Sequence, residues 1–137
     1  MKLKPVIWTV RDKTALLLAL MEQLAGNAHM SFEGDLKAFS ILKFPASGYT
    51  ETTVLKRHTI WPKQDFVVVP LEASSGPAIL NAIGGRVPRR IMHFQIEKAG
   101  VLEFGAYDSF DPECLFFGPA LQGPFQESAI SRGLVTR

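Results

Sequence analysis

The residues best suited to chemistry in this sequence are a histidine and three carboxylates that lie in or near one predicted hairpin. His93 and Glu103 belong to its two strands, Glu33 ends the separately predicted strand 29–33, and Asp108 opens the turn that follows the hairpin. An imidazole beside a carboxylate can move a proton or contribute to a metal site. These four residues are therefore the candidate catalytic set of a small hydrolase, in which the carboxylates would orient the imidazole or hold a metal.

The same residues also have a purely structural interpretation. An antiparallel sheet commonly packs one face on the core and leaves the other face polar and solvated. His93, Gln95 and Glu103 alternate with apolar residues along the hairpin, as the residues of such a solvated face do. We favour this interpretation over catalysis.

The histidines and the cysteine form no local motif for metal binding or nucleophilic catalysis. No two of His29, His58 and His93 are two or four residues apart, so a pair such as HExxH is absent. Cys114 has no adjacent base to activate it. We therefore expect neither a metal nor a cofactor.

A second group of residues is more typical of binding. The connector GGRVPRR contains Arg86, Arg89 and Arg90, and the arginine fork matches carboxylate and phosphate groups. The connector follows a predicted helix C-terminus, which is the wrong end of the helix dipole for a phosphate. We interpret these arginines, together with Trp61 and Gln95, as the rim and anchor of a protein-binding surface.

The hairpin at 91–107 is the element that the pattern predicts in most detail. A three-residue loop at 98–100 would pair His93 with Gly105 and place every apolar residue of the hairpin on one face. Gly100 would take the left-handed conformation that such loops need. Gly105 would leave open space beside the imidazole.

The rest of the chain predicts alternating strands and helices. Apolar periodicity and capping residues indicate helices in the segments 13–25, 74–85 and 123–133. Short apolar or alternating runs indicate strands in the segments 5–10, 29–33, 52–60, 65–72 and 113–118. In the resulting order a βαββ run occurs twice, which would fit duplicated βαββ units, although no sequence repeat accompanies it.

We therefore predict a single α+β domain over residues 1–137. Its core would be a mostly antiparallel sheet of about six or seven strands, with two or three helices packed on one face. A chain of 137 residues is long enough to bury such a core.

Composition narrows the function classes. The single cysteine cannot form an internal disulfide, which favours a cytoplasmic protein. No apolar run reaches the roughly 20 residues of a membrane helix, so we expect no membrane partner. The net charge of +2 is spread along the chain, which argues against nucleic acid as a partner.

We expect a non-enzymatic domain that binds another protein, as an inhibitor, immunity-type protein or adaptor, or that associates with itself. The alternative is the small hydrolase.

Overall fold

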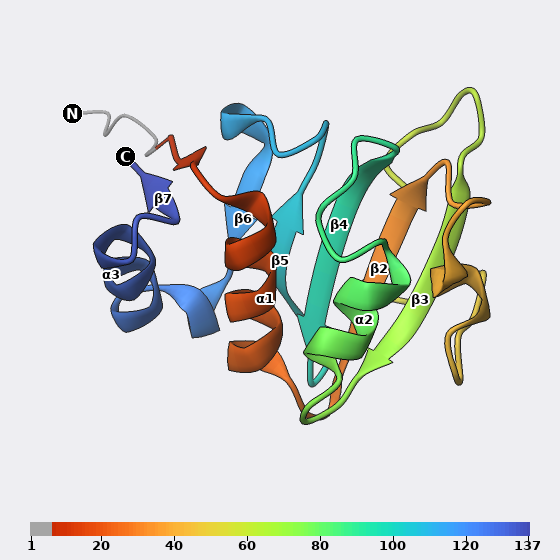
Figure 1. Cartoon of the computed structure of the whole chain (residues 1–137), viewed down its shortest axis with the longest axis horizontal. Coiled ribbons are helices and arrows are strands. Elements are labelled where there is room, and N and C mark those ends of the chain that lie inside the picture. Colours follow the sequence, from red (N-terminus) through yellow and green to blue (C-terminus); the bar gives the residue numbers. More distant parts are fainter. Residues whose placement is uncertain (1–6) are drawn as a thin grey trace.

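The computed structural model describes residues 7–137, which form an α+β fold with two antiparallel sheets (Figure 1). The α-helices are α1 (Lys13–Leu24), α2 (Gly76–Ala82) and α3 (Pro124–Ser131). The strands are β1 (Thr9–Val10), β2 (Ala28–Gly34), β3 (Asp65–Leu71), β4 (Ile91–Lys98), β5 (Val101–Ala106), β6 (Leu115–Phe117) and β7 (Val135–Thr136). Short 3-10 helices span Ser40–Lys43, Pro112–Cys114 and Pro119–Leu121.

The main sheet has the strand order β3-β2-β4-β5-β6, and β1 pairs with β7 in a separate two-stranded sheet. The predicted α+β class, the antiparallel sheet and the three predicted helices are confirmed. The duplicated βαββ unit is not seen, because β1 lies outside the main sheet. Residues 5 and 6 of the predicted strand 5–10 lie outside the described residues. Among the described residues, no helix is long and apolar enough to cross a membrane.

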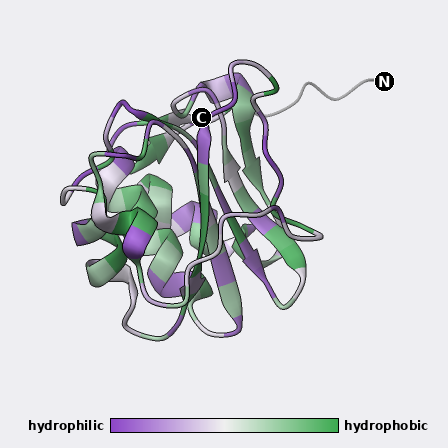
Figure 2. Ribbon diagram, turned by 90° about the vertical axis from the view of Figure 1, so that its right-hand side faces the viewer, coloured by the Kyte–Doolittle hydropathy of each residue, from purple (hydrophilic) through white to green (hydrophobic). Residues whose placement is uncertain are grey.

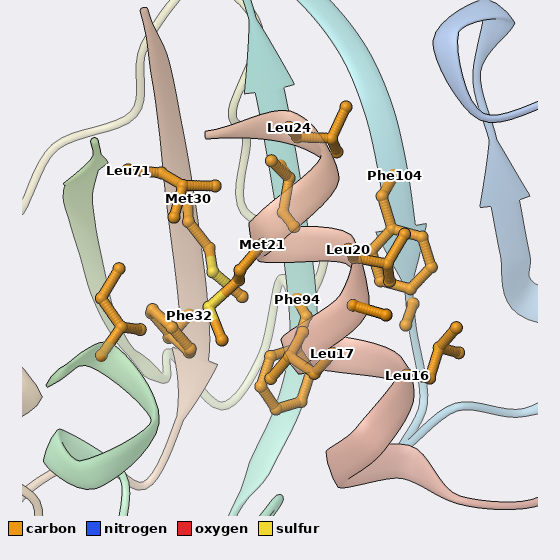
Figure 3. Close-up of a cluster of buried hydrophobic side chains, with 14 of the residues drawn as sticks. Leu16, Leu17, Leu20, Met21, Leu24, Met30, Phe32, Leu71, Phe94 and Phe104 are labelled. Atoms are coloured by element: carbon orange, nitrogen blue, oxygen red, sulfur yellow. The ribbon is translucent and has the colours of Figure 1, made fainter. Parts of the chain in front are cut away.

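The core lies between one face of the main sheet and the helices α1 and α2. In the side view of Figure 2 the helices lie on one side of the sheet. Figure 3 shows leucines of α1 over the aromatic rings of the strands, with Leu17 near Phe94 and Leu20 near Phe104. All four side chains are fully buried. Since burying one such side chain contributes about 1.5–3 kcal/mol, this contact fixes the sheet face that the helices cover.

Helix α1 begins at a capping aspartate. The Asp12 carboxylate accepts a hydrogen bond from the backbone N–H of Ala15 at 3.0 Å, which satisfies a donor that has no partner within the helix. We expect Asp12→Ala to lower the free energy of unfolding by about 1 kcal/mol, measured by urea denaturation. Asp12→Asn should retain most of the stability, and equal losses in both variants would contradict a capping role.

The β4–β5 hairpin corrects the predicted register. Its loop is the two-residue pair Ala99-Gly100, with φ values of 51° and 83°, and not the three-residue loop that we expected. Two-residue loops with positive φ at both positions match the twist of antiparallel strands. A β-bulge at Glu103 then adds one residue to β5, so that the pairing changes from Glu97 opposite Leu102 to Ile96 opposite Phe104.

The bulge explains why the apolar faces were still predicted largely correctly. Beyond it, Phe94, Ile96 and Phe104 all belong to the main core, as the three-residue loop also required. Leu102, before the bulge, lies instead on the opposite face of the sheet, where it packs against the small cluster of Leu55, Phe66 and Val68.

The prediction of a strand at 52–60 is wrong. This segment is a coil that continues to Gln64, and we call residues 52–64 the strap. The strap packs on the sheet through Leu55, which is fully buried. It therefore covers part of the sheet face that α1 and α2 leave free.

Candidate functional site

The strap is fastened to the sheet by a buried carboxylate. Glu33, on β2, is 1% exposed. Its two oxygens accept hydrogen bonds from the backbone N–H groups of His58 at 2.8 Å and Thr59 at 3.2 Å. Both oxygens of the carboxylate are therefore engaged in holding the strap.

A second fastening point is Gln95, on β4. Its Nε2 donates to the Lys56 carbonyl oxygen at 2.7 Å and to Ser31 Oγ at 3.1 Å. Its Oε1 accepts from the Tyr107 hydroxyl and from His58 Nε2, both at 3.3 Å. The side chain is buried with its polar atoms satisfied, so the prediction that Gln95 lies on an open binding surface is wrong. The strap covers it.

His93, the centre of the candidate catalytic set, is also buried, with 3% of its surface exposed. Its Nδ1 accepts a hydrogen bond from the backbone N–H of Asp108 at 3.2 Å, and its Nε2 lies 2.7 Å from Thr59 Oγ1. Because Nδ1 is an acceptor, the proton of the neutral ring must be on Nε2. His93 therefore donates to the Thr59 hydroxyl oxygen.

The environment of His93 favours this neutral form. Burial lowers the pKa of His93, and it outweighs the carboxylates of Glu33 and Asp108, which act in the opposite direction. His58, whose ring centre lies 5.8 Å away, lowers the pKa further. The imidazole is thus a neutral hydrogen-bonding group in the fold.

The Thr59–His93 contact has the distance of a nucleophile and its general base, but the proton is on the wrong nitrogen. In such a pair the imidazole nitrogen facing the hydroxyl must be unprotonated to accept its proton. Here that nitrogen, Nε2, donates. The contact therefore gives the hydrolase hypothesis no support, and it acts as a third fastening of the strap.

The structure brings only part of the candidate catalytic set together. Glu33 and His93 are direct cross-strand neighbours. Glu103 faces elsewhere: its bulged position lets the carboxylate accept from the backbone N–H of Ala120 at 3.0 Å, and Gly105, not Glu103, is opposite Gln95. Among residues 7–137, no three histidine, cysteine, aspartate or glutamate side chains are placed to hold a metal ion.

Asp108 lies in the turn after β5, with a φ of 49°. Its side chain is exposed and accepts a weak hydrogen bond from the Cys114 thiol at 3.7 Å. It acts on His93 through its backbone N–H rather than by orienting the ring with its carboxylate.

The sequence suggested open space beside Gly105. In the structure this space is filled. A Cβ atom on Gly105 would come within 2.5 Å of the Tyr107 hydroxyl. The absence of a side chain lets the Tyr107 ring fold back over the strand, where it stacks on His58 with ring centres 3.9 Å apart. Burial raises the pKa of Tyr107, which keeps its hydroxyl a donor to Gln95.

Thr59, His58 and Tyr107 also belong to this network, and the sequence did not predict their place in it. The first two lie in the segment that was predicted to be a strand, so nothing placed them over β2 and β4. A useful signal was the presence of Glu33 and Gln95 on strands in which the alternate residues are mostly apolar. Such a polar pair is satisfied either by water or by a covering segment.

The strap carries an exposed apolar tip, Ile60-Trp61-Pro62. Ile60 is 94% exposed and Trp61 is 84% exposed. The backbone before the tip is held by Glu33, and after it the Gln64 carbonyl oxygen accepts from Arg57 Nη1 at 2.6 Å. The predicted anchor Trp61 is thus fully accessible on a loop that is fixed at both ends.

The predicted rim arginines form a separate surface. Arg86, Arg89 and Arg90 border a hollow of about 720 Å³ next to the end of α2. Its walls include Phe39 and Ile83. The tip and this hollow share no lining residue.

Comparisons with protein-family models, with curated proteins and with solved structures found no match to this chain.

Proposed function

We propose that this chain is a cytoplasmic, non-enzymatic protein-binding domain that uses the tip Ile60-Trp61-Pro62 as its anchor. The observation that carries the proposal is the nearly complete exposure of two large apolar neighbours, Ile60 at 94% and Trp61 at 84%. Single exposed apolar residues are common, but an adjacent isoleucine and tryptophan that stay in water forgo the favourable free energy that burial in a partner would provide. Tryptophan is also among the residues most enriched at binding hot spots.

The fastening of the strap supports this role. An anchor on a flexible loop loses conformational entropy when it binds, whereas an anchor that is already ordered avoids this cost. The buried side chains of Glu33, Gln95 and His93 form hydrogen bonds to the strap. Three such contacts hold the strap in one position, as a preorganised binding loop requires.

The charges next to the tip indicate the chemistry of its partner. Lys56 and Lys63 are exposed on either side of it, and the Arg57 guanidinium lies over the Phe66 ring, 5.0 Å from its centre. A partner protein with an apolar pocket bordered by carboxylates would complement this pattern. A second copy of the chain would bring like charges together at the tip, so we favour a different, acidic protein over self-association.

We expect Trp61→Ala to weaken partner binding at least about 30-fold, which corresponds to the 2 kcal/mol of a hot-spot residue. The free energy of unfolding should change by less than about 0.5 kcal/mol, because the side chain is exposed. The partner would be identified by crosslinking and affinity capture, and its affinity measured by calorimetry with the purified proteins.

The matched control is Phe116→Ala, which removes another exposed aromatic ring, 42% exposed, from the edge strand β6. Its partner affinity should equal that of the original chain. Equal affinity of the Trp61→Ala variant would overturn the proposal. A concentration-dependent dimer in analytical ultracentrifugation that Trp61→Ala abolishes would instead assign the tip to self-association.

A further inference from the structure

The arginine-lined hollow is the second surface with the character of a binding site. It has a volume of about 720 Å³, within the range of small-molecule pockets. Phe39, Ile83, Val87 and Pro88 supply apolar wall, and the three arginines of the connector supply charge. A site with an apolar wall and a few convergent charges is the usual form of a small-ligand site.

Within residues 7–137, the three guanidinium groups form no ion pair. Among the described residues, neither an ion pair nor a side-chain hydrogen bond involves Arg86, Arg89 or Arg90. Asp35 is held close to the connector, because its backbone N–H donates to the Arg90 carbonyl oxygen at 2.9 Å, but its carboxylate forms no ion pair there. Three like charges around one hollow repel one another until an anion is bound.

The connector that presents these arginines is constrained by hydrogen bonds. The backbone N–H of Val87 donates to Thr14 Oγ1 on α1 at 3.0 Å. The backbone N–H of Gly85 donates to the Leu80 carbonyl oxygen at 2.9 Å, and Gly84, with a φ of 96°, ends α2 in the left-handed conformation. The backbone that carries the charges is therefore ordered before any ligand arrives.

From these observations we infer that the hollow binds a small organic anion, with a phosphate or carboxylate group on the arginines and an apolar or aromatic body against Phe39. The guanidinium fork pairs with both kinds of oxyanion. The C-terminal end of α2 opposes an anion, but α2 has only seven residues and three full charges outweigh its dipole. This site is independent of the proposed protein-binding tip.

The test is a calorimetric titration of the full chain with four probes: ADP, inorganic pyrophosphate, citrate and adenosine. We expect a Kd below about 1 mM for ADP or citrate and no saturation by adenosine, which lacks the anion. Saturation by ADP but not citrate assigns a phosphate ligand, and the reverse assigns a carboxylate. Weaker binding of pyrophosphate than of ADP would show that the apolar wall contributes.

The variant Arg86→Ala/Arg89→Ala/Arg90→Ala should weaken binding at least about tenfold. Arg132→Ala, an exposed arginine beside α3 that borders a different hollow, controls for the loss of a positive charge. Arg89→Lys retains the charge without the fork and should fall between them, which keeps the test decisive if the triple variant unfolds. Unchanged affinity in the triple variant, or no saturable binding by any probe up to about 10 mM, overturns the inference.

Discussion

Replacing Glu33 with glutamine is expected to release the strap from the sheet. The carboxylate accepts two backbone N–H groups, and hydrogen bonds to a charged group contribute about 1.5–3 kcal/mol each. The glutamine oxygen can accept only one of them well, and its amide group turns a donor toward the other donor. Removing a buried charge offsets part of this loss, so we expect the strap to be destabilised by about 2 kcal/mol.

Hydrogen exchange measured by NMR locates this effect. The amide protons of His58 and Thr59 should exchange about 30-fold faster in Glu33→Gln, the factor that corresponds to 2 kcal/mol. Amides in the centre of α1 should change less, because the strap lies on the other face of the sheet.

The matched control is Glu51→Gln. Glu51 also accepts a hydrogen bond from the backbone of the strap, from the Arg57 N–H at 2.9 Å, but its side chain is exposed. Water can replace an exposed partner, so this variant should change stability by less than about 0.5 kcal/mol. Equal effects of the two substitutions would show that Glu33 does not fasten the strap.

The hairpin shows how far alternation alone can predict a fold. The repeated apolar residues of 91–107 correctly placed Phe94 and Phe104 on one face. Loop length and register were wrong, since a bulge at Glu103 compensates for a loop that is one residue shorter. Two errors of one residue each restore the same faces, and a pattern of period two cannot distinguish the combinations.

The candidate site was harder to predict because it depends on what covers the sheet. His93 and Gln95 were correctly placed on the polar face, but that face was interpreted as solvated, whereas both residues are buried. A polar face paired with water and a polar face paired with a covering segment have the same sequence pattern. Only the path of the strap, through long-range contacts from Glu33 to Thr59, distinguishes them.

The surface residues illustrate the opposite case. Trp61 and the three arginines were predicted to be accessible, and the structure places them so. Their separation into two surfaces could not be read from the sequence, because it depends on where the connector after α2 and the strap lie relative to the sheet.

Acidification is expected to weaken the strap through His93. In the fold, Nδ1 accepts the Asp108 N–H, and protonation would place two donors face to face. The groups around the ring are Glu33 on β2, Thr59 and His58 on the strap, and Tyr107 and Asp108 after β5. Burial affects the pKa of His93 more than these neighbours do, and it lowers that pKa.

The sign of the pH dependence follows from this direction. A lowered pKa means that the folded chain binds fewer protons than the unfolded chain between the two pKa values, so stability rises with pH in that window. The full stability is therefore present above the unfolded pKa of about 6.5. It is lost as the pH falls from there toward the lowered pKa of the folded state. Since the strap carries Trp61, partner binding should weaken over the same range.

Two measurements test this dependence. The ¹⁵N chemical shifts of the His93 imidazole should show the Nε2–H tautomer at neutral pH, and the exchange of the Thr59 amide should accelerate as the pH is lowered through the window, after correction for intrinsic exchange. His93→Gln cannot titrate and should remove this acceleration, whereas His29→Gln, which alters an imidazole paired with Glu97 away from the strap fastening, should retain it. An Nδ1–H tautomer, or the same pH dependence in His93→Gln, would show that another group controls the strap.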